Sequence, residues 1–270
     1  MRRCGAEAGM KRFKFSLMVI VLVLAAASAP AQEKTDSGAT VKTVLARLFD
    51  FSNNQALQSP EARSLLLGEA LDWKMPTFGE LAAAPDKVVL LDAENAVGRI
   101  QLHGKNRVVD IYFYLKLQDS WKVSAVRTLA LTGIVEGACE YLKTKPNLTA
   151  EEKYDLGNCE LVLASDEVLR QWFAKNAAAM NALSGLSRGL KPRREEQDPH
   201  YAEIKARLKA LDFAAVEVED DGTIEFTIGG ITDNTVGFLY SPANKPPKIS
   251  SNLYIWVEEI APKWFLFRTT

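Results

Sequence analysis

The segment from Val108 to Leu117 constrains the fold of this chain more than any other. Along it every second side chain is apolar, at Val109, Ile111, Phe113, Leu115 and Leu117. Such alternation is typical of a strand that buries one face. Strands are also predicted over 96–103 and 121–131, and a tight turn at Asp119 and Ser120 precedes the second of these. The sequence therefore predicts an antiparallel meander over residues 88–131.

Two helices are predicted before this meander. Apolar side chains from Val41 to Phe49 recur at the spacing i, i+3, i+4, i+7, which is typical of an amphipathic helix. Ser59 and Pro60 are the residue types favoured at an N-cap and at the first helical position. Helices that cover antiparallel strands make an α+β layer, and we assign this layer to a first domain over residues 41–132.

The turn Asp-Ser-Trp-Lys-Val, residues 119–123, opens the last of these strands. Helices followed by long antiparallel strands with such a turn resemble the cystatin-like fold of the NTF2-like superfamily, over residues 41–132. The resemblance implies a conical pocket between a curled sheet and its helices. Members of this superfamily include enzymes, ligand binders and structural modules, so the resemblance implies no single function.

Enzymes of the NTF2-like superfamily use carboxylates, histidines or tyrosines in that pocket. Asp110, Tyr112, Tyr114 and His103 are chemically suitable for such a role. No spacing fixes them to a catalytic motif, so we assign no catalytic residue.

Residues 133–187 have helical periodicity. Thr149 and Glu152 are predicted to form a capping box at the start of one of these helices. Trp172 and Phe173 belong to an apolar stripe of a later helix, and we interpret this stripe as core. We expect this helical segment to pack on the first domain.

Residues 188–198 are the best candidate for a domain boundary, because they are rich in glycine, proline and basic residues. Residues 199–270 are then predicted to form a small α+β domain of one helix and five antiparallel strands. The sequence Asp-Asp-Gly at 220–222 is a strong hairpin signal within it. The nearby Glu217 and Glu219 add acidic charge but lack calcium-loop spacing, so we interpret this cluster as solvated turn charges.

The N-terminus has the features of a secretory signal peptide. Basic residues precede an apolar run from Phe15 to Ala27, and small residues follow it up to Ala31. We predict removal of residues 1–31 and export of the protein, either to a periplasm or out of the cell. The apolar run is shorter than the roughly 20 residues of a spanning helix, so we expect no stable membrane anchor. Residues 32–40 are predicted to be a flexible tether.

Two cysteines, Cys139 and Cys159, remain after the predicted cleavage. In a compartment that permits disulfides they can form a bridge, which would link two helices as a hairpin. The alternative is a pair of buried free thiols. Both possibilities are compatible with the sequence.

The composition excludes several classes of function. The chain has 33 Lys+Arg against 34 Asp+Glu, and the predicted signal peptide is basic, so nucleic acid is not an expected partner. Two histidines without ligand spacing predict no metal site. Residues 185–189 match the G-x-S-x-G elbow, but a predicted helix precedes them where the motif requires a strand. We therefore expect no catalytic residue, no cofactor and no enzymatic activity.

The remaining candidates are aromatic side chains that can form a ligand or partner surface. The candidate binding residues are Asp110, Tyr112, Tyr114, Tyr254 and Trp256. If other elements cover these faces, the aromatic side chains are core instead. We predict an exported, non-enzymatic binding protein for a small apolar ligand or a protein partner. The alternatives are a periplasmic immunity-type protein that acts by occlusion, and an NTF2-like pocket enzyme with Asp110 or a tyrosine as base.

Overall fold

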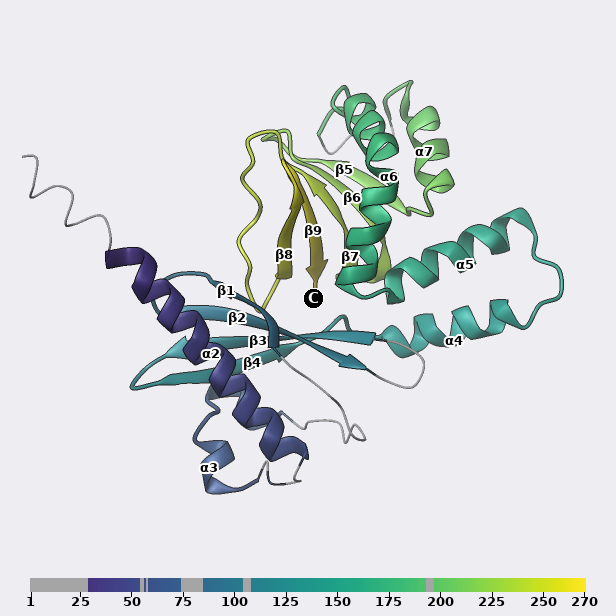
Figure 1. Ribbon diagram of the computed structural model, residues 1–270. Helices are drawn as coiled ribbons and strands as arrows, with labels where there is room; N and C mark the ends of the chain where they lie inside the picture. The colour runs from purple at the N-terminus through teal and green to yellow at the C-terminus, as the bar shows by residue number, and fades with distance from the viewer. Residues whose placement is uncertain (1–28, 54–55, 57, 74–84, 104–107, 193–196) are drawn as a thin grey trace, which may run out of the picture.

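The computed structural model describes residues 29–53, 56, 58–73, 85–103, 108–192 and 197–270. It has the predicted α+β class, with two antiparallel sheets and helices that cover one face of each (Figure 1).

The first sheet is the predicted meander. Its strands are β1 (Pro85–Leu90), β2 (Asn95–His103), β3 (Val108–Leu117) and β4 (Trp121–Arg127), in the order β1-β2-β3-β4. Every neighbouring pair is antiparallel, and Ile100 of β2 lies opposite Ile111 of β3. The period-two alternation in β3 therefore predicted its secondary structure correctly.

One face of this sheet is covered by α2 (Ala29–Asn53), with α3 (Pro60–Arg63) and the 3-10 helix η1 (Gly68–Leu71) beside it. Leu45 and Leu48 of α2 and Phe113 of β3 are fully buried in the core between helix and sheet. A Cβ atom at Gly98 would lie 2.4 Å from Cδ1 of Leu45, so only glycine allows this close approach. Within the described residues, apolar side chains of α2, of η1 and of strands β2–β4 form one buried core on this side of the sheet.

The predicted tether over residues 32–40 is helical, because α2 begins at Ala29. This expectation was wrong for a physical reason. The segment Ala-Gln-Glu-Lys at 31–34 consists of good helix formers, and extending an existing helix costs far less than nucleating one. The segment lacks an apolar stripe, so periodicity alone does not reveal it. Most of the predicted signal peptide, residues 1–28, lies outside the described residues, and its cleavage remains a prediction.

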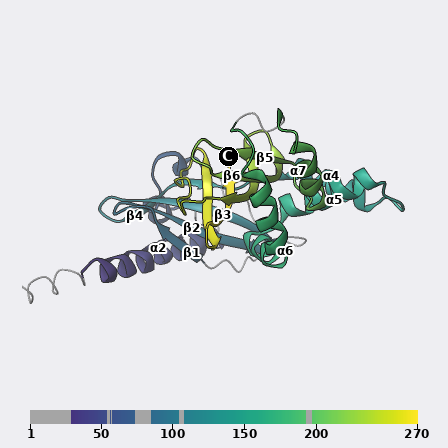
Figure 2. The same ribbon diagram turned by 90° about the horizontal axis from the view of Figure 1, so that it is seen from above.

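The helices α4 (Thr132–Lys143) and α5 (Ala150–Leu163) form a hairpin that projects from the rest of the molecule (Figures 1 and 2). A disulfide joins Cys139 and Cys159, whose Cα atoms are 5.9 Å apart. The two cysteines therefore form a bridge in the structure and are not free thiols. The predicted capping box of Thr149 and Glu152 opens α5.

The second sheet has the order β5-β6-β7-β9-β8 and carries α6 (Asp166–Ser187) and α7 (Tyr201–Ala210) on one face. Its strands are β5 (Ala215–Val218), β6 (Ile224–Ile231), β7 (Asn234–Tyr240), β8 (Tyr254–Ala261) and β9 (Trp264–Thr269). The predicted hairpin turn joins β5 to β6. One helix and five strands after residue 198 agree with the prediction.

The helical segment 133–187 packs on this second sheet and not, as expected, on the first. The ring of Phe173 lies 5.3 Å from Phe238 and 5.1 Å from Trp264, and Trp172 stacks on Phe238. An apolar stripe needs an apolar partner face, and the second sheet offers aromatic side chains there. The other face of the first sheet is contacted by Ile255 and Trp256 of the second sheet, and it presents the buried Arg99 and Asp110 toward the start of α6. Leu190, within the predicted boundary 188–198, is buried in this same core.

Candidate functional site

Four of the five predicted binding residues meet where the two sheets contact each other. Tyr112 and Tyr114 of β3 pack against Trp256 of β8, and the rings of Tyr112 and Trp256 stack with centroids 5.1 Å apart. Asp110 is buried beside them. The hypothesis that these residues form an exposed surface is therefore wrong. The second sheet lies across this face of the first (Figure 2) and makes them core.

The centre of this contact is Asp166, at the first position of α6, which is fully buried. Arg99 donates from Nη1 to its Oδ2 at 2.9 Å, and Arg268 donates from Nε to its Oδ1 at 2.8 Å. The Tyr112 hydroxyl donates to Oδ2 at 2.9 Å. Burial alone would raise the pKa of Asp166, but Arg268 and Arg99 outweigh it and hold the pKa below its usual range.

Further charged side chains extend this arrangement to β1 and β8. Glu258 accepts hydrogen bonds from Lys87 at 2.6 Å, from Arg170 at 2.7 Å and from the Trp256 indole at 3.1 Å. The inter-sheet network, as we call it, comprises Asp86, Asp110, Asp166 and Glu258 with Lys87, Arg99, Arg170 and Arg268. Arg170 also pairs with Glu167 of its own helix, and each of the buried charges has an oppositely charged partner. Such a network fixes how two layers meet.

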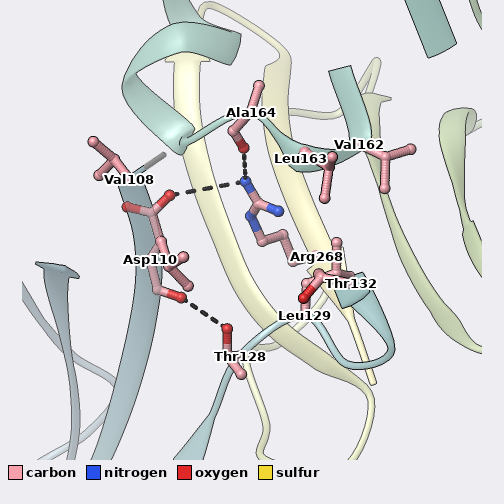
Figure 3. A pocket seen from close by; sticks show the side chains of 10 residues that line it. Val108, Asp110, Thr128, Leu129, Thr132, Val162, Leu163, Ala164 and Arg268 are labelled. Carbon is pink, nitrogen blue, oxygen red and sulfur yellow. Dashed lines mark hydrogen bonds and ion pairs between the residues drawn. The ribbon is translucent and has the colours of Figure 1, made fainter. Parts of the chain in front are cut away.

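Asp110 lies at the edge of the inter-sheet network. Its Oδ2 accepts from the backbone N–H of Asp166 at 2.7 Å, and its Oδ1 accepts from Gln101 at 3.1 Å. Burial and the nearby Asp166 carboxylate raise the pKa of Asp110 to about 6. Figure 3 shows the Asp110 carboxylate and the Arg268 guanidinium directed toward each other beside a small cavity of about 20 Å³. That volume holds about one water molecule, so Asp110 does not face a substrate-sized pocket.

The fifth predicted residue, Tyr254, lies apart from the other four. Its hydroxyl donates to Glu225 Oε2 at 3.0 Å, and its ring packs edge-on against Phe267. Tyr254 and Glu225 line a second cavity of about 500 Å³, which we call the Glu225 cavity. The β5–β6 turn and the β7–β8 loop, residues 241–253, form its walls.

Glu225 is the chemically unusual group of this cavity. Burial, together with the nearby Glu217 and Glu219, raises the pKa of Glu225 to about 7, although the hydrogen bond from Tyr254 opposes this shift. Glu217 lies directly opposite Glu225 on the neighbouring strand β5. A carboxyl group that changes charge near neutral pH inside a ligand-sized cavity is a candidate binding group.

The sequence indicated some of these residues and missed others. Alternation along β6 placed Glu225 on the face opposite Ile224 and Phe226, but no motif singled it out. The sequence did not single out Asp166 as a candidate site residue either. The available signal was a charged residue inside an otherwise apolar strand, as at Arg99 and Arg268, because such residues are rarely buried without a partner.

Within the described ranges, no three His, Cys, Asp or Glu side chains are grouped so that they could hold a metal ion. No helix in the described part of the chain combines the length and apolar character needed to cross a bilayer. Comparisons with protein-family models, curated proteins and solved structures find no match to this chain.

Proposed function

We propose that this chain is an exported, non-enzymatic binding protein that holds a small ligand with a positively charged amine group in the Glu225 cavity. The observation that carries the proposal is the Glu225–Tyr254 pair inside a cavity of ligand size. A volume of about 500 Å³ falls in the range of small-molecule sites in proteins.

The charges around the cavity favour a cation. Its lining contains the carboxylates of Glu219, Asp220, Asp221 and Glu225, against a single basic residue, Lys245. A cleft lined mainly by one sign of charge concentrates ligands of the opposite sign. An ammonium group beside Glu225 would also supply the counter-charge that the half-buried carboxylate lacks.

The apolar part of the ligand has its own contacts. Pro246 and Pro247 form one wall, and the ring of Tyr254 lies in the lining. An aromatic face attracts an ammonium group in addition to its hydrophobic contact. A purely apolar ligand fits the Glu225 cavity less well, because the lining of this cavity is acidic.

The test uses benzylamine as the probe, with benzyl alcohol as its neutral counterpart, in calorimetric titrations of the protein at pH 8 and pH 6. We expect benzylamine to bind more tightly at pH 8, where Glu225 is ionised, than at pH 6, where a proton occupies it. Benzyl alcohol should bind weakly at both values. Equal affinity for the two probes, or no binding of either, would rule out this function.

The matched variants are Glu225→Gln and Glu259→Gln. Glu259 is an exposed carboxylate on β8 and does not line the cavity. Glu225→Gln should weaken benzylamine binding about tenfold and remove its pH dependence, since a loss near 1.4 kcal/mol is a factor of ten. Glu259→Gln should leave both unchanged.

Export is the second part of the proposal. It is supported by the signal-peptide features of residues 1–31 and by the Cys139–Cys159 bridge, because disulfides persist mainly in oxidising compartments. Mass spectrometry of the protein recovered from its host would test it. A mature N-terminus at Gln32 is expected, and an intact protein retained in the cytosol would contradict export.

Recognition of a protein partner is the second candidate function. Leu131, Ile134 and Tyr141 are exposed apolar residues at or near the projecting helix α4. Occlusion of a toxin, as in an immunity protein, would use such a surface, and rescue of growth during toxin exposure would support it. The pocket-enzyme alternative has less support, because the cavity at Asp110 holds only about one water molecule.

A further inference from the structure

A third cavity, of about 670 Å³, lies between the first sheet and the β7–β8 loop. We call it the Lys248 crevice. Its sheet side is formed by the β1–β2 turn and by parts of β3 and β4, and its loop side by residues 248–251. The crevice is separate from the Glu225 cavity, which uses residues 245–247 of the same loop.

The loop wall of the crevice is held in place by the first sheet. The hydroxyl of Tyr114 is within donating distance of two carbonyl oxygens, those of Ile255 at 2.7 Å and Ser250 at 3.0 Å. Arg127 donates from Nε to the carbonyl oxygen of Ser251 at 2.8 Å. These bonds anchor the loop at residues 250 and 251, so the crevice is preformed, which lowers the entropic cost of binding a ligand.

The crevice has polar and apolar parts, and its apolar part is formed mainly by Leu91 and Ile249. Leu91 and Ile249 are half-buried and pack against the cluster that contains Tyr114 and Ile255. An apolar wall of this kind accommodates the hydrocarbon or aromatic body of a ligand.

Two charged residues, Asp92 and Lys248, line the crevice, and only one is available to a ligand. Asp92 accepts from the backbone N–H groups of Glu94 and Asn95, both at 2.8 Å, and from the Asn95 side chain at 2.9 Å. Its carboxylate is therefore occupied by its own turn. Lys248 is exposed and forms no hydrogen bond or ion pair with any other residue that the structure describes.

We propose that the Lys248 crevice is a second ligand site, which binds an amphipathic anion. The apolar body of the ligand lies against Leu91 and Ile249, and its carboxylate or sulfonate pairs with Lys248. This site is separate from the amine site at Glu225, and its ligand preference is for an anion because Lys248 is the charged group that a ligand can reach.

The test uses 8-anilinonaphthalene-1-sulfonate, which combines an aromatic body with one sulfonate, in calorimetric and fluorescence titrations of the full chain. We expect a single saturable site. Lys248→Gln should weaken its affinity about two- to fivefold, since an exposed charge pair contributes up to about that factor. Lys245→Gln is the matched control, because it removes the same charge from the same loop but outside the crevice. It should leave the affinity unchanged.

A second probe and a second variant separate charge from apolar contact. N-phenyl-1-naphthylamine lacks the sulfonate, so its binding should not change in Lys248→Gln, whereas Ile249→Ser should weaken both probes. Non-saturable binding, or equal effects of Lys248→Gln and Lys245→Gln, would overturn the proposal. Glu225→Gln should leave sulfonate binding unchanged, so this result is read separately from the benzylamine experiment.

Discussion

Arg99 on β2 donates from Nη1 to Oδ2 of Asp166 at 2.9 Å, and both side chains are almost completely buried. The two residues are 67 positions apart and belong to the two different layers of the molecule. This pair links the first sheet to the start of α6, on which the second layer is built. The first sheet supplies the positive charge of this pair, and the second layer supplies the negative charge. We infer that the pair helps to set how the two layers are placed.

Replacing Asp166 tests this dependence. Asp166→Asn keeps the shape of the side chain but leaves the buried Arg99 and Arg268 without their shared counter-charge. We expect the free energy of unfolding to fall by about 3–5 kcal/mol, which is typical when one partner of a buried ion pair is removed. Chemical denaturation monitored by tryptophan fluorescence measures it.

The control for this variant is Glu203→Gln on α7. Glu203 pairs with Arg207 at the surface at 2.7 Å, and both side chains are about half exposed. Its loss should change the free energy of unfolding by less than about 0.5 kcal/mol. Similar effects of the two variants would show that the inter-sheet network does not hold the layers together.

The pH dependence of stability should reveal Asp110. Its pKa is about 6 in the folded protein and near 3.8 when unfolded, so the folded state binds the proton more tightly. A raised folded-state pKa means that this contribution is complete below pH 3.8 and is lost as the pH rises through about 6. The contribution amounts to about 3 kcal/mol for a shift of roughly two units.

Asp110→Asn is the variant that isolates this effect. Its amide can keep the hydrogen bond from the Asp166 backbone but cannot titrate. The unfolding free energy of both proteins is measured by guanidinium denaturation from pH 4 to pH 7.5. As the pH rises, wild type should lose stability relative to Asp110→Asn. A constant difference over this range would contradict the raised pKa.

The contact of α2 with the first sheet should be sensitive to a single methyl group. Gly98→Ala places a Cβ atom 2.4 Å from Leu45, so the helix must shift or the leucine must change its rotamer. We expect a loss of about 1–3 kcal/mol of stability, as for overpacked cores. Thermal unfolding followed by circular dichroism measures the change.

Gly137→Ala on α4 is the matched control. A Cβ atom at this position meets nothing within 4 Å, and alanine favours the helix over glycine by about 1 kcal/mol. The two glycine-to-alanine changes should therefore shift the melting temperature in opposite directions. A lower melting temperature for both variants would contradict the open space beside Gly137.

Local features of the candidate sites were predictable, and their assembly was not. The sequence indicated Tyr254 as a candidate binding residue, but its partner Glu225 lies 29 positions away, on a strand that is not its neighbour in the sheet. Tyr112 and Trp256 belong to two different predicted domains, and the structure stacks their rings on each other. Nothing within a few residues of either ring specifies this contact.

The sequence by itself determined the elements: the alternating strands, the apolar stripes of the helices, the cap at Thr149 and the hairpin at 220–222. These depend on backbone geometry and on neighbours a few positions away. Only the tertiary structure decided that α6 packs on the second sheet and that Arg268 meets Asp166, 102 residues earlier. The physical reason is that a buried charge needs an opposite charge wherever the chain can bring one, and sequence distance places no limit on that choice.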